Sequence, residues 1–377
     1  MRSYLSAILL FLLFCCTFNL RGQIFGDIFE TADDSLMRGS KQAGLFVLPL
    51  IYYSPDTRFG AGALGVYYFH LKNEHADQKD STRLSYVKLL ADYTQNRQTD
   101  VWSSWNIFLK DEAYLFKGEF RFRNFPDRYY GVGNTTSGDQ MERYEYNLLS
   151  FKFLALKKIM PQMFAGLDIQ VVQEYGLQRE PDGELDQGNI TGYDGGLGVG
   201  AGGVFTWDAR DNVVNASRGF LLEVATYIDH PFLGSDFKFN NYNITYNRYF
   251  KVAERQVFAT NLVGNFNTGD VPFLDMARVG GEEILRGYAR NRYRDKNFIG
   301  GQVEYRFPLV WRFGGVAFAG LGDVFDRPSE VTMSTLKYSF GGGLRFLVSK
   351  REGINVRFDY GFGRDSQAFY ISLTEAF

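Results

Sequence analysis

The sequence predicts an all-β fold, a transmembrane antiparallel β-barrel of about sixteen strands, and three observations lead to this prediction. First, segments of about ten residues alternate in polarity; Val303 and Tyr305 share one parity, and Glu304 and Arg306 share the other. Second, 41 Gly and 17% aromatic residues suit a β-rich chain with many turns. Third, after the N-terminus no apolar run approaches the roughly 20 residues of a spanning helix. A membrane protein of this composition must therefore cross with strands, with lipid outside and water inside.

The charge balance excludes one class of partner. The 377 residues carry 41 Lys and Arg against 43 Asp and Glu, a formal net charge of −2 at pH 7. This balance lacks the basic excess of a nucleic-acid-binding domain, so we expect no nucleic-acid partner.

Residues 1–22 are predicted to be a secretory signal peptide. Arg2 supplies the positive start, and the apolar stretch 5–18 is too short to span a bilayer. Both cysteines, Cys15 and Cys16, lie in this segment, which leaves lipidation of one of them as an alternative. After cleavage the mature chain would have no thiol for disulfide or redox chemistry.

After residue 22 the chain divides into two parts. Residues 23–42 form a short polar-mixed segment, expected on the periplasmic side, and residues 43–377 are expected to form the barrel. Turn-rich segments separate the predicted strands, and an even number of strands returns the chain to its starting side. The predicted strands are 43–53, 58–71, 83–95, 99–110, 113–124, 144–157, 162–177, 193–207, 220–229, 236–250, 256–268, 297–307, 314–325, 335–349, 353–363 and 367–377.

Alternation continues to the last residue of the sequence. The apolar positions of the last predicted strand and the terminal aromatic share one parity, namely Phe369, Ile371, Leu373 and Phe377. A terminal aromatic after an alternating strand is what the outer-membrane assembly machinery is expected to read. A soluble β-sandwich is the alternative, but it would explain neither the secretion signal nor this ending.

Residues 278–309 resemble the BamA/TamA/FhaC superfamily of outer-membrane assembly and translocation barrels, the bacterial surface antigen family. The resemblance rests on Leu285-Arg286-Gly287-Tyr288 in a long loop after a strand, followed by Gly300-Gly301 and the sequence EYRFPL at 304–309. Further agreement in sequence order comes from the stretches 130–134, 208–212 with 218–219, 318–323 and 357–361. The resemblance covers essentially the whole mature chain as a barrel domain, without the periplasmic POTRA domains that better-known members carry.

The resemblance implies that the loop folds back into the lumen with Arg286 as its anchor. Gly287 would allow a tight turn, and Tyr288 would wedge against the wall. A guanidinium can hold two carboxylates, and the candidates of lumen parity are Glu304, Asp323 and Asp359. The alternative is that Arg286 is an ordinary solvated loop residue. The neighbouring charges Glu282, Glu283, Arg290, Arg292 and Arg294 are expected to be ordinary loop charges.

A closed barrel must pair its first and last strands. The first predicted strand contains Pro49, which has no amide hydrogen and removes one donor from a ladder. If the missing donor faces the last strand, the seam is weak and could part sideways, with Gly361 and Gly363 adding flexibility. The alternative is an ordinary seam, with Pro49 facing a bulge or the second strand.

The resemblance implies a function in inserting or translocating outer-membrane proteins, polypeptides or lipids at the outer membrane of a Gram-negative bacterium. The implied partners are outer-membrane lipid, nascent outer-membrane proteins, and periplasmic or lipoprotein assembly factors. The alternative is a passive pore or a structural subunit of a larger complex. An enzyme is not expected, since none of the three His lies in a nucleophile motif and no cluster has metal-ligand spacing. We therefore predict neither cofactor nor metal.

Overall fold

A computed structural model describes residues 43–54, 58–72, 82–350 and 353–377 of the chain. The predictions for residues 1–22 and 23–42 lie outside the described residues. No helix in the part of the chain that the structure describes is long and apolar enough to cross a membrane.

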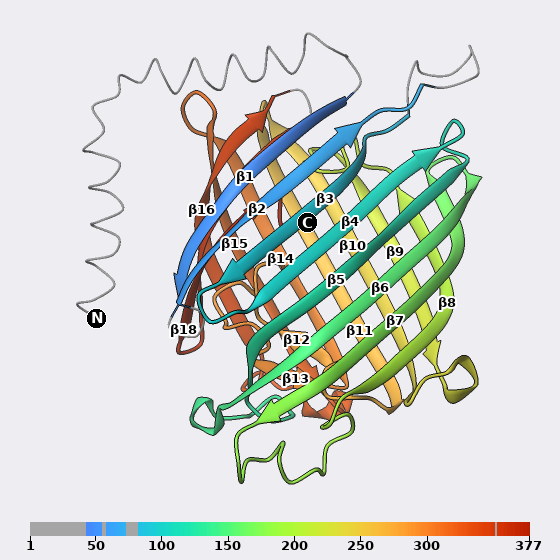
Figure 1. Ribbon diagram of the computed structural model, residues 1–377. Coiled ribbons are helices and arrows are strands. Elements are labelled where there is room, and N and C mark those ends of the chain that lie inside the picture. Colours follow the sequence, from blue (N-terminus) through green and yellow to red (C-terminus); the bar gives the residue numbers. More distant parts are fainter. Residues whose placement is uncertain (1–42, 55–57, 73–81, 351–352) are drawn as a thin grey trace. The chain divides into compact units, whose positions relative to one another are not determined.

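Sixteen strands form one sheet, joined edge to edge in the order β1 to β11 and then β14 to β18 (Figure 1). The neighbouring pairs from β2 to β18 are antiparallel. The all-β prediction is therefore confirmed, and each predicted strand overlaps an observed one. The strands are β1 (Ala43–Ser54), β2 (Arg58–Phe69), β3 (Ser85–Thr94), β4 (Thr99–Leu109), β5 (Tyr114–Tyr129), β6 (Glu142–Met160), β7 (Met163–Arg179), β8 (Gly196–Asp208), β9 (Gly219–Asp229), β10 (Lys238–Ala253), β11 (Gln256–Asp270), β14 (Asn297–Pro308), β15 (Phe313–Phe325), β16 (Lys337–Ser349), β17 (Ile354–Gly363) and β18 (Ser366–Leu373).

Two differences from the prediction concern the loops. Strands β5 and β6 run further than expected, because their ladder continues to the pair Tyr129↔Glu142 and shortens the loop between them. The long loop between β11 and β14 contains a hairpin of its own, β12 (Ala277–Val279) paired with β13 (Tyr293–Asp295).

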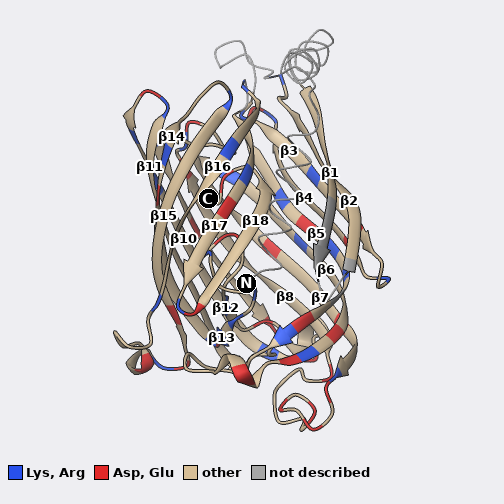
Figure 2. Cartoon of the chain, turned by 90° about the vertical axis from the view of Figure 1, so that its left-hand side faces the viewer, with Lys and Arg blue, Asp and Glu red and all other residues tan. Residues whose placement is uncertain are grey.

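The two faces of the sheet differ in polarity as the alternation predicts. Along β14, Ile299 and Val303 are 50% and 37% exposed, whereas Glu304 is completely buried. We call the face that carries Glu304 the inner face and the other the outer face. Figure 2 shows charged positions interspersed along the strands as well as in the loops. An exposed apolar outer face and a charged inner face are the arrangement expected of a sheet surrounded by lipid.

Connections of different length emerge at the two edges of the sheet (Figure 1). Residues 130–141, 180–195, 271–296 and 326–336 join strands at what we call the long-loop edge. Shorter turns, such as 161–162 and 254–255, join strands at the other edge, which we call the short-turn edge although the β8–β9 connection there, 209–218, is longer. Since β1 begins at the short-turn edge and the last residues lie beyond β18 at the same edge, the sixteen strands return the chain to its starting edge.

Strands β1 and β18 are the first and last of the strand order, and no ladder between them is found among the described residues. Pro49 is exposed on β1 together with Leu45 and Val47, which places its side chain on the outer face. Closure of the sheet and weakness of the seam therefore stay predictions.

Candidate functional site

The loop between β11 and β14 packs against the inner face of the sheet. Its hairpin and the tip between β12 and β13 form a buried apolar cluster with the ends of β14 and β15. The cluster consists of Ala277, Val279, Leu285, Tyr288, Tyr293, Phe298 and Val324. Burial of these side chains stabilises the loop at this position, so that the tip meets the charged residues of the inner face.

Arg286 connects two distant strands. Its Nη1 donates to Asp359 Oδ2 on β17 at 2.6 Å, and its Nη2 donates to Glu304 Oε1 on β14 at 2.5 Å. The guanidinium lies over the ring of Phe318 on β15, 3.7 Å from the centroid. All three charged side chains are completely buried. The fork of the guanidinium thus holds one carboxylate with each arm, in a site shielded from water.

Each of the two carboxylates also binds a second arginine. Glu304 Oε2 accepts from Arg306 Nε at 2.9 Å, and Asp359 Oδ1 accepts from Arg345 Nη1 at 2.6 Å. Several charge-assisted hydrogen bonds thus replace the hydration that each buried carboxylate loses.

Gly287 and Tyr288 lie in a groove formed by glycines of β17. A Cβ atom at Gly361 would lie 2.6 Å from the carbonyl oxygen of Arg286, and one at Gly363 would lie 2.6 Å from the ring of Tyr288. Gly287 has φ +120° and donates its amide to the hydroxyl of Tyr370 at 3.0 Å. The missing side chains of Gly361 and Gly363 thus admit the loop at close approach, and the flexibility of the seam at these glycines stays a prediction.

Asp323 does not contact Arg286. It accepts a bond from Lys337 Nζ at 2.8 Å and one from Asn134 Nδ2 at 3.2 Å, nearer the long-loop edge. The β14–β15 register gives the reason: Asp323 lies opposite Ile299, five positions along β14 from Glu304, or roughly 17 Å at 3.3 Å per residue. The alternation predicts that Asp323 lies on the inner face, but it does not predict how far along the strand direction Asp323 lies from Arg286.

Two arginines that the sequence suggested were ordinary loop charges are structural. Arg294 is completely buried; its Nη1 donates to the carbonyl of Phe273 at 3.1 Å, and its guanidinium lies 5.3 Å from the ring of Tyr129. Arg292 donates to the carbonyl of Thr136 at 2.8 Å. The only sequence signal for this arrangement was the aromatic density at the end of β5, which offers faces to guanidinium groups. By contrast, Glu282, Glu283 and Arg290 are exposed, as expected.

The end of the chain departs from the predicted strand. Phe369 and Ile371 lie on the outer face, 57% and 51% exposed, whereas Leu373 is buried at the end of β18. Phe377 does not continue their row, because Thr374 has φ +68° and turns the chain out of the strand. Phe377 instead packs on the cluster of Ala216, Tyr249, Val257 and Ala259.

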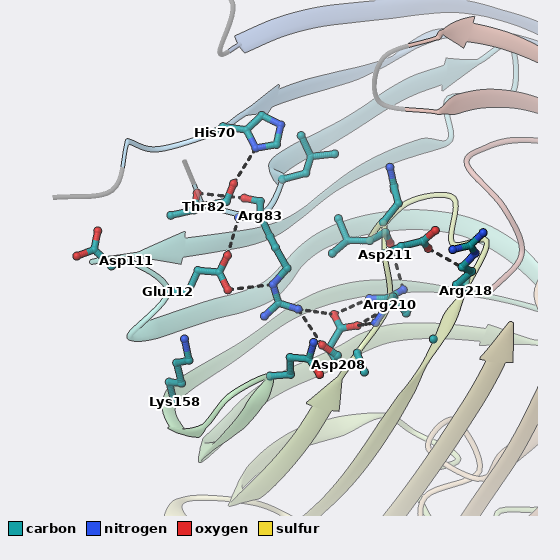
Figure 3. A pocket seen from close by; sticks show the side chains of 16 residues that line it. His70, Thr82, Arg83, Asp111, Glu112, Lys158, Asp208, Arg210, Asp211 and Arg218 are labelled. Carbon is teal, nitrogen blue, oxygen red and sulfur yellow. Dashed lines mark hydrogen bonds and ion pairs between the residues drawn. The ribbon is translucent and has the colours of Figure 1, made fainter. Parts of the chain in front are cut away.

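A polar cavity of about 730 Å³ opens at the short-turn edge (Figure 3). Asp208 binds Arg210 through both oxygens, at 2.9 and 3.0 Å, and its carbonyl accepts from Arg83 Nη1 at 3.0 Å. Arg83 Nε donates to Glu112 at 3.1 Å. Asp208 therefore joins the end of β8 to Arg83, just before β3, whereas the bonds of Arg210 stay within the end of β8 and the β8–β9 turn. No group of three or more potential metal ligands occurs in the described ranges.

Comparisons with known proteins agree with the fold. The family profile described as the Omp85 superfamily domain matches residues 191–377. BamA from Haemophilus ducreyi lacking POTRA domains 1–3 is similar in structure, with a TM-score of 0.54 and 12% identity, over 88% of this chain and 69% of that one. So are CdiB from Acinetobacter baumannii (0.53, 11%, 89% and 60%) and CdiB from Escherichia coli (0.54, 12%, 88% and 62%).

At such identities the likeness concerns the fold, which is that of BamA-type barrels. The chain spans about six tenths of the length of the two CdiB chains. No curated protein sequence matches it.

Proposed function

We propose, from the premise that this chain carries an Omp85 superfamily domain over residues 191–377, that it assists the insertion or translocation of outer-membrane proteins, polypeptides or lipids. The observation that carries the proposal is the Arg286 fork, which joins a loop from the long-loop edge to carboxylates on β14 and β17. A loop fixed in this way on the inner face ties β14 to β17, next to the last strand of the sheet.

The chemistry of the site supports transport or assembly rather than catalysis. Arg286, Glu304 and Asp359 are fully buried, and both carboxylates are bound by Arg286 and by a further arginine, which leaves no nucleophile beside a free base at this site. Omp85-type barrels are in general assembly or translocation proteins and not enzymes. An open channel is also poorly supported, because the anchored loop and its apolar cluster occupy part of the inner side.

The end strands offer a physical route for assembly. A nascent strand that enters lipid needs a partner for its backbone hydrogen bonds, since each unpaired group costs several kcal/mol there. If β1 and β18 form the seam of the barrel and part sideways, their free edges would supply that partner. Pro49, which lacks an amide hydrogen, would weaken the seam.

Residues 1–22 would be removed during export, and residues 23–42 would remain on the periplasmic side.

The partners should reveal the function. An assembly factor extracted from its native outer membrane in mild detergent should bring assembly lipoproteins, periplasmic factors and nascent barrel proteins with it. Purification and mass spectrometry of the tagged full chain would test this, with a barrel of unrelated function as the control. Recovery of the chain alone, together with a high single-channel conductance in a planar bilayer, would instead identify a passive pore.

A further inference from the structure

The segment that follows β18, residues 374–377, lies on the inner face and is called the tail below. Thr374 leaves the strand with φ +68°, although its amide still donates to the carbonyl of Asn355 at 2.8 Å. Phe377 packs on side chains of β10, β11 and the β8–β9 turn. Its main-chain oxygen accepts from Arg306 Nη2 at 3.0 Å. The tail therefore leaves its own strand and reaches toward β10 and β11, several strands away in the sheet order.

Glu375 is the charged residue of the tail. Its Oε2 accepts from Arg345 Nε at 2.7 Å and lies 3.7 Å from Arg306 Nε, while its Oε1 accepts from Asn355 Nδ2 at 2.7 Å. The side chain is only 3% exposed. Burial alone would raise the pKa of Glu375, but Arg345 and Arg306 lower it below the ordinary value.

The two arginines that hold Glu375 are the same two that hold the partners of Arg286. Arg345 joins Glu375 to Asp359, and Arg306 joins Glu375 to Glu304. Arg286 then closes a ring of six buried groups in which positive and negative charges alternate. In order the ring is Arg286, Asp359, Arg345, Glu375, Arg306 and Glu304.

We propose that Glu375 is a positioning residue for the Arg286 loop, so that the tail and the loop hold each other on the inner face. With Glu375 in place, the three positive and three negative charges of the ring balance. The neighbouring Arg357, whose Nε lies 3.6 Å from Asp359 Oδ2, has Glu282 outside the ring as a further carboxylate partner at 3.6 Å. Without Glu375, Arg306 and Arg345 keep only Glu304 and Asp359 as carboxylate side-chain partners, and their uncompensated charge repels Arg286 in a site shielded from water. The Arg286 loop then binds the inner face less tightly.

Coupling of this kind is reciprocal: a loop that leaves the ring releases the tail by the same factor. Because the tail continues β18, a displacement of the last strand would reach the loop from the long-loop edge through the ring. The proposal concerns the folded chain itself and does not depend on what the protein transports, so it can be tested on purified protein.

The test is hydrogen exchange, read by mass spectrometry, on the full chain in lipid nanodiscs. Glu375→Gln removes one charge and keeps the volume of the side chain. Exchange of residues 282–290 should become at least tenfold faster, while a reference segment of β6 and β7 stays within twofold. Asp326→Asn is the matched control, because Asp326 is a half-exposed carboxylate whose partners, Lys296 at 3.3 Å and Arg327 at 3.8 Å, lie outside the ring. It should leave the loop unchanged.

A second pair of variants separates coupling from general destabilisation. In an Arg286→Ala background, Glu375→Gln should change loop exchange less than threefold, and Arg286→Ala alone should expose the tail to the extent that Glu375→Gln exposes the loop. Should Glu375→Gln fail to fold, the shorter carboxylate of Glu375→Asp, which cannot reach both arginines equally, replaces it and should accelerate the loop several-fold. Loop exchange equal to wild type, or equal acceleration in the reference segment, would overturn the proposal.

Discussion

Replacing Arg286 by Ala removes the one side chain that binds both Glu304 and Asp359. Loss of one partner of a buried ion pair destabilises by about 3–5 kcal/mol, because a buried charge is left behind. Here Glu304 keeps Arg306 at 2.9 Å and Asp359 keeps Arg345 at 2.6 Å, which favours the lower end of that range, about 3 kcal/mol. The lost contact with the Phe318 ring at 3.7 Å adds about 1–2 kcal/mol.

We therefore expect the loop bound to the inner face to be destabilised by about 4 kcal/mol relative to the released loop. At about 1.4 kcal/mol per factor of ten, hydrogen exchange of residues 282–290 should accelerate by more than a hundredfold. Arg286→Lys restores a charge but not the fork, since one ammonium group cannot take the place of two separate Nη donors, and should recover less than half of the loss. Both variants should still shift between cold and boiled samples in a detergent gel, because the sheet is intact. Wild-type loop exchange in Arg286→Ala would refute the assignment and return Arg286 to the status of a solvated loop residue.

Three further predictions concern the groove, the long-loop edge and the seam. Gly361→Ala should displace the loop and accelerate its exchange, because the new Cβ would lie 2.6 Å from the Arg286 carbonyl; Gly203→Ala, whose Cβ would lie 3.9 Å from the nearest atom, should not. Burial raises the pKa of Asp275 to about 6, against the opposing pull of Arg278, above the unfolded value of about 3.9. The folded state thus favours the protonated form of Asp275, so the contribution of Asp275 to stability at the long-loop edge is greatest at acidic pH and is lost as the pH rises through 6. Proteolysis of the loops should therefore be slower at pH 5 than at pH 7.5. Asp275→Asn should reduce this difference between the two pH values. Finally, an oxidised cysteine pair across β1 and β18 should block function reversibly, whereas full complementation of a deletion strain by the locked protein would exclude sideways opening of the seam.

Alternation made the face of each strand residue predictable. Glu304 and Asp359 were assigned to the inner side because side chains of a strand alternate with a period of two, whatever its neighbours do. The same rule placed Phe369 and Ile371 on the outer face. Such a pattern is local, so it survives into the folded sheet.

The position of a residue along the strand direction, relative to residues of other strands, depends on the registers of all the intervening strands. The sequence of a single strand does not encode those registers. For this reason Asp323, of the right parity, binds Lys337 instead of Arg286. For the same reason the sequence did not predict the groove of Gly361 and Gly363, because this groove exists only where a separate loop contacts β17. Burial of Arg294 likewise depends on aromatic rings brought together from β5 and the β11–β14 loop.

The sequence by itself determined that this chain is a many-stranded sheet with a charged inner face, an apolar outer face and a loop carrying Arg286. Those properties follow from the order of residues along single strands and turns. Only the tertiary structure decided that Arg286 binds two strands at once and that Glu375 closes the ring from the opposite edge. Charges separated by up to 89 positions along the chain meet there. Which charges lie close together depends on the registers of the sixteen strands. Pairing of the buried charges then stabilises one set of registers over others that would leave the same residues on the inner face.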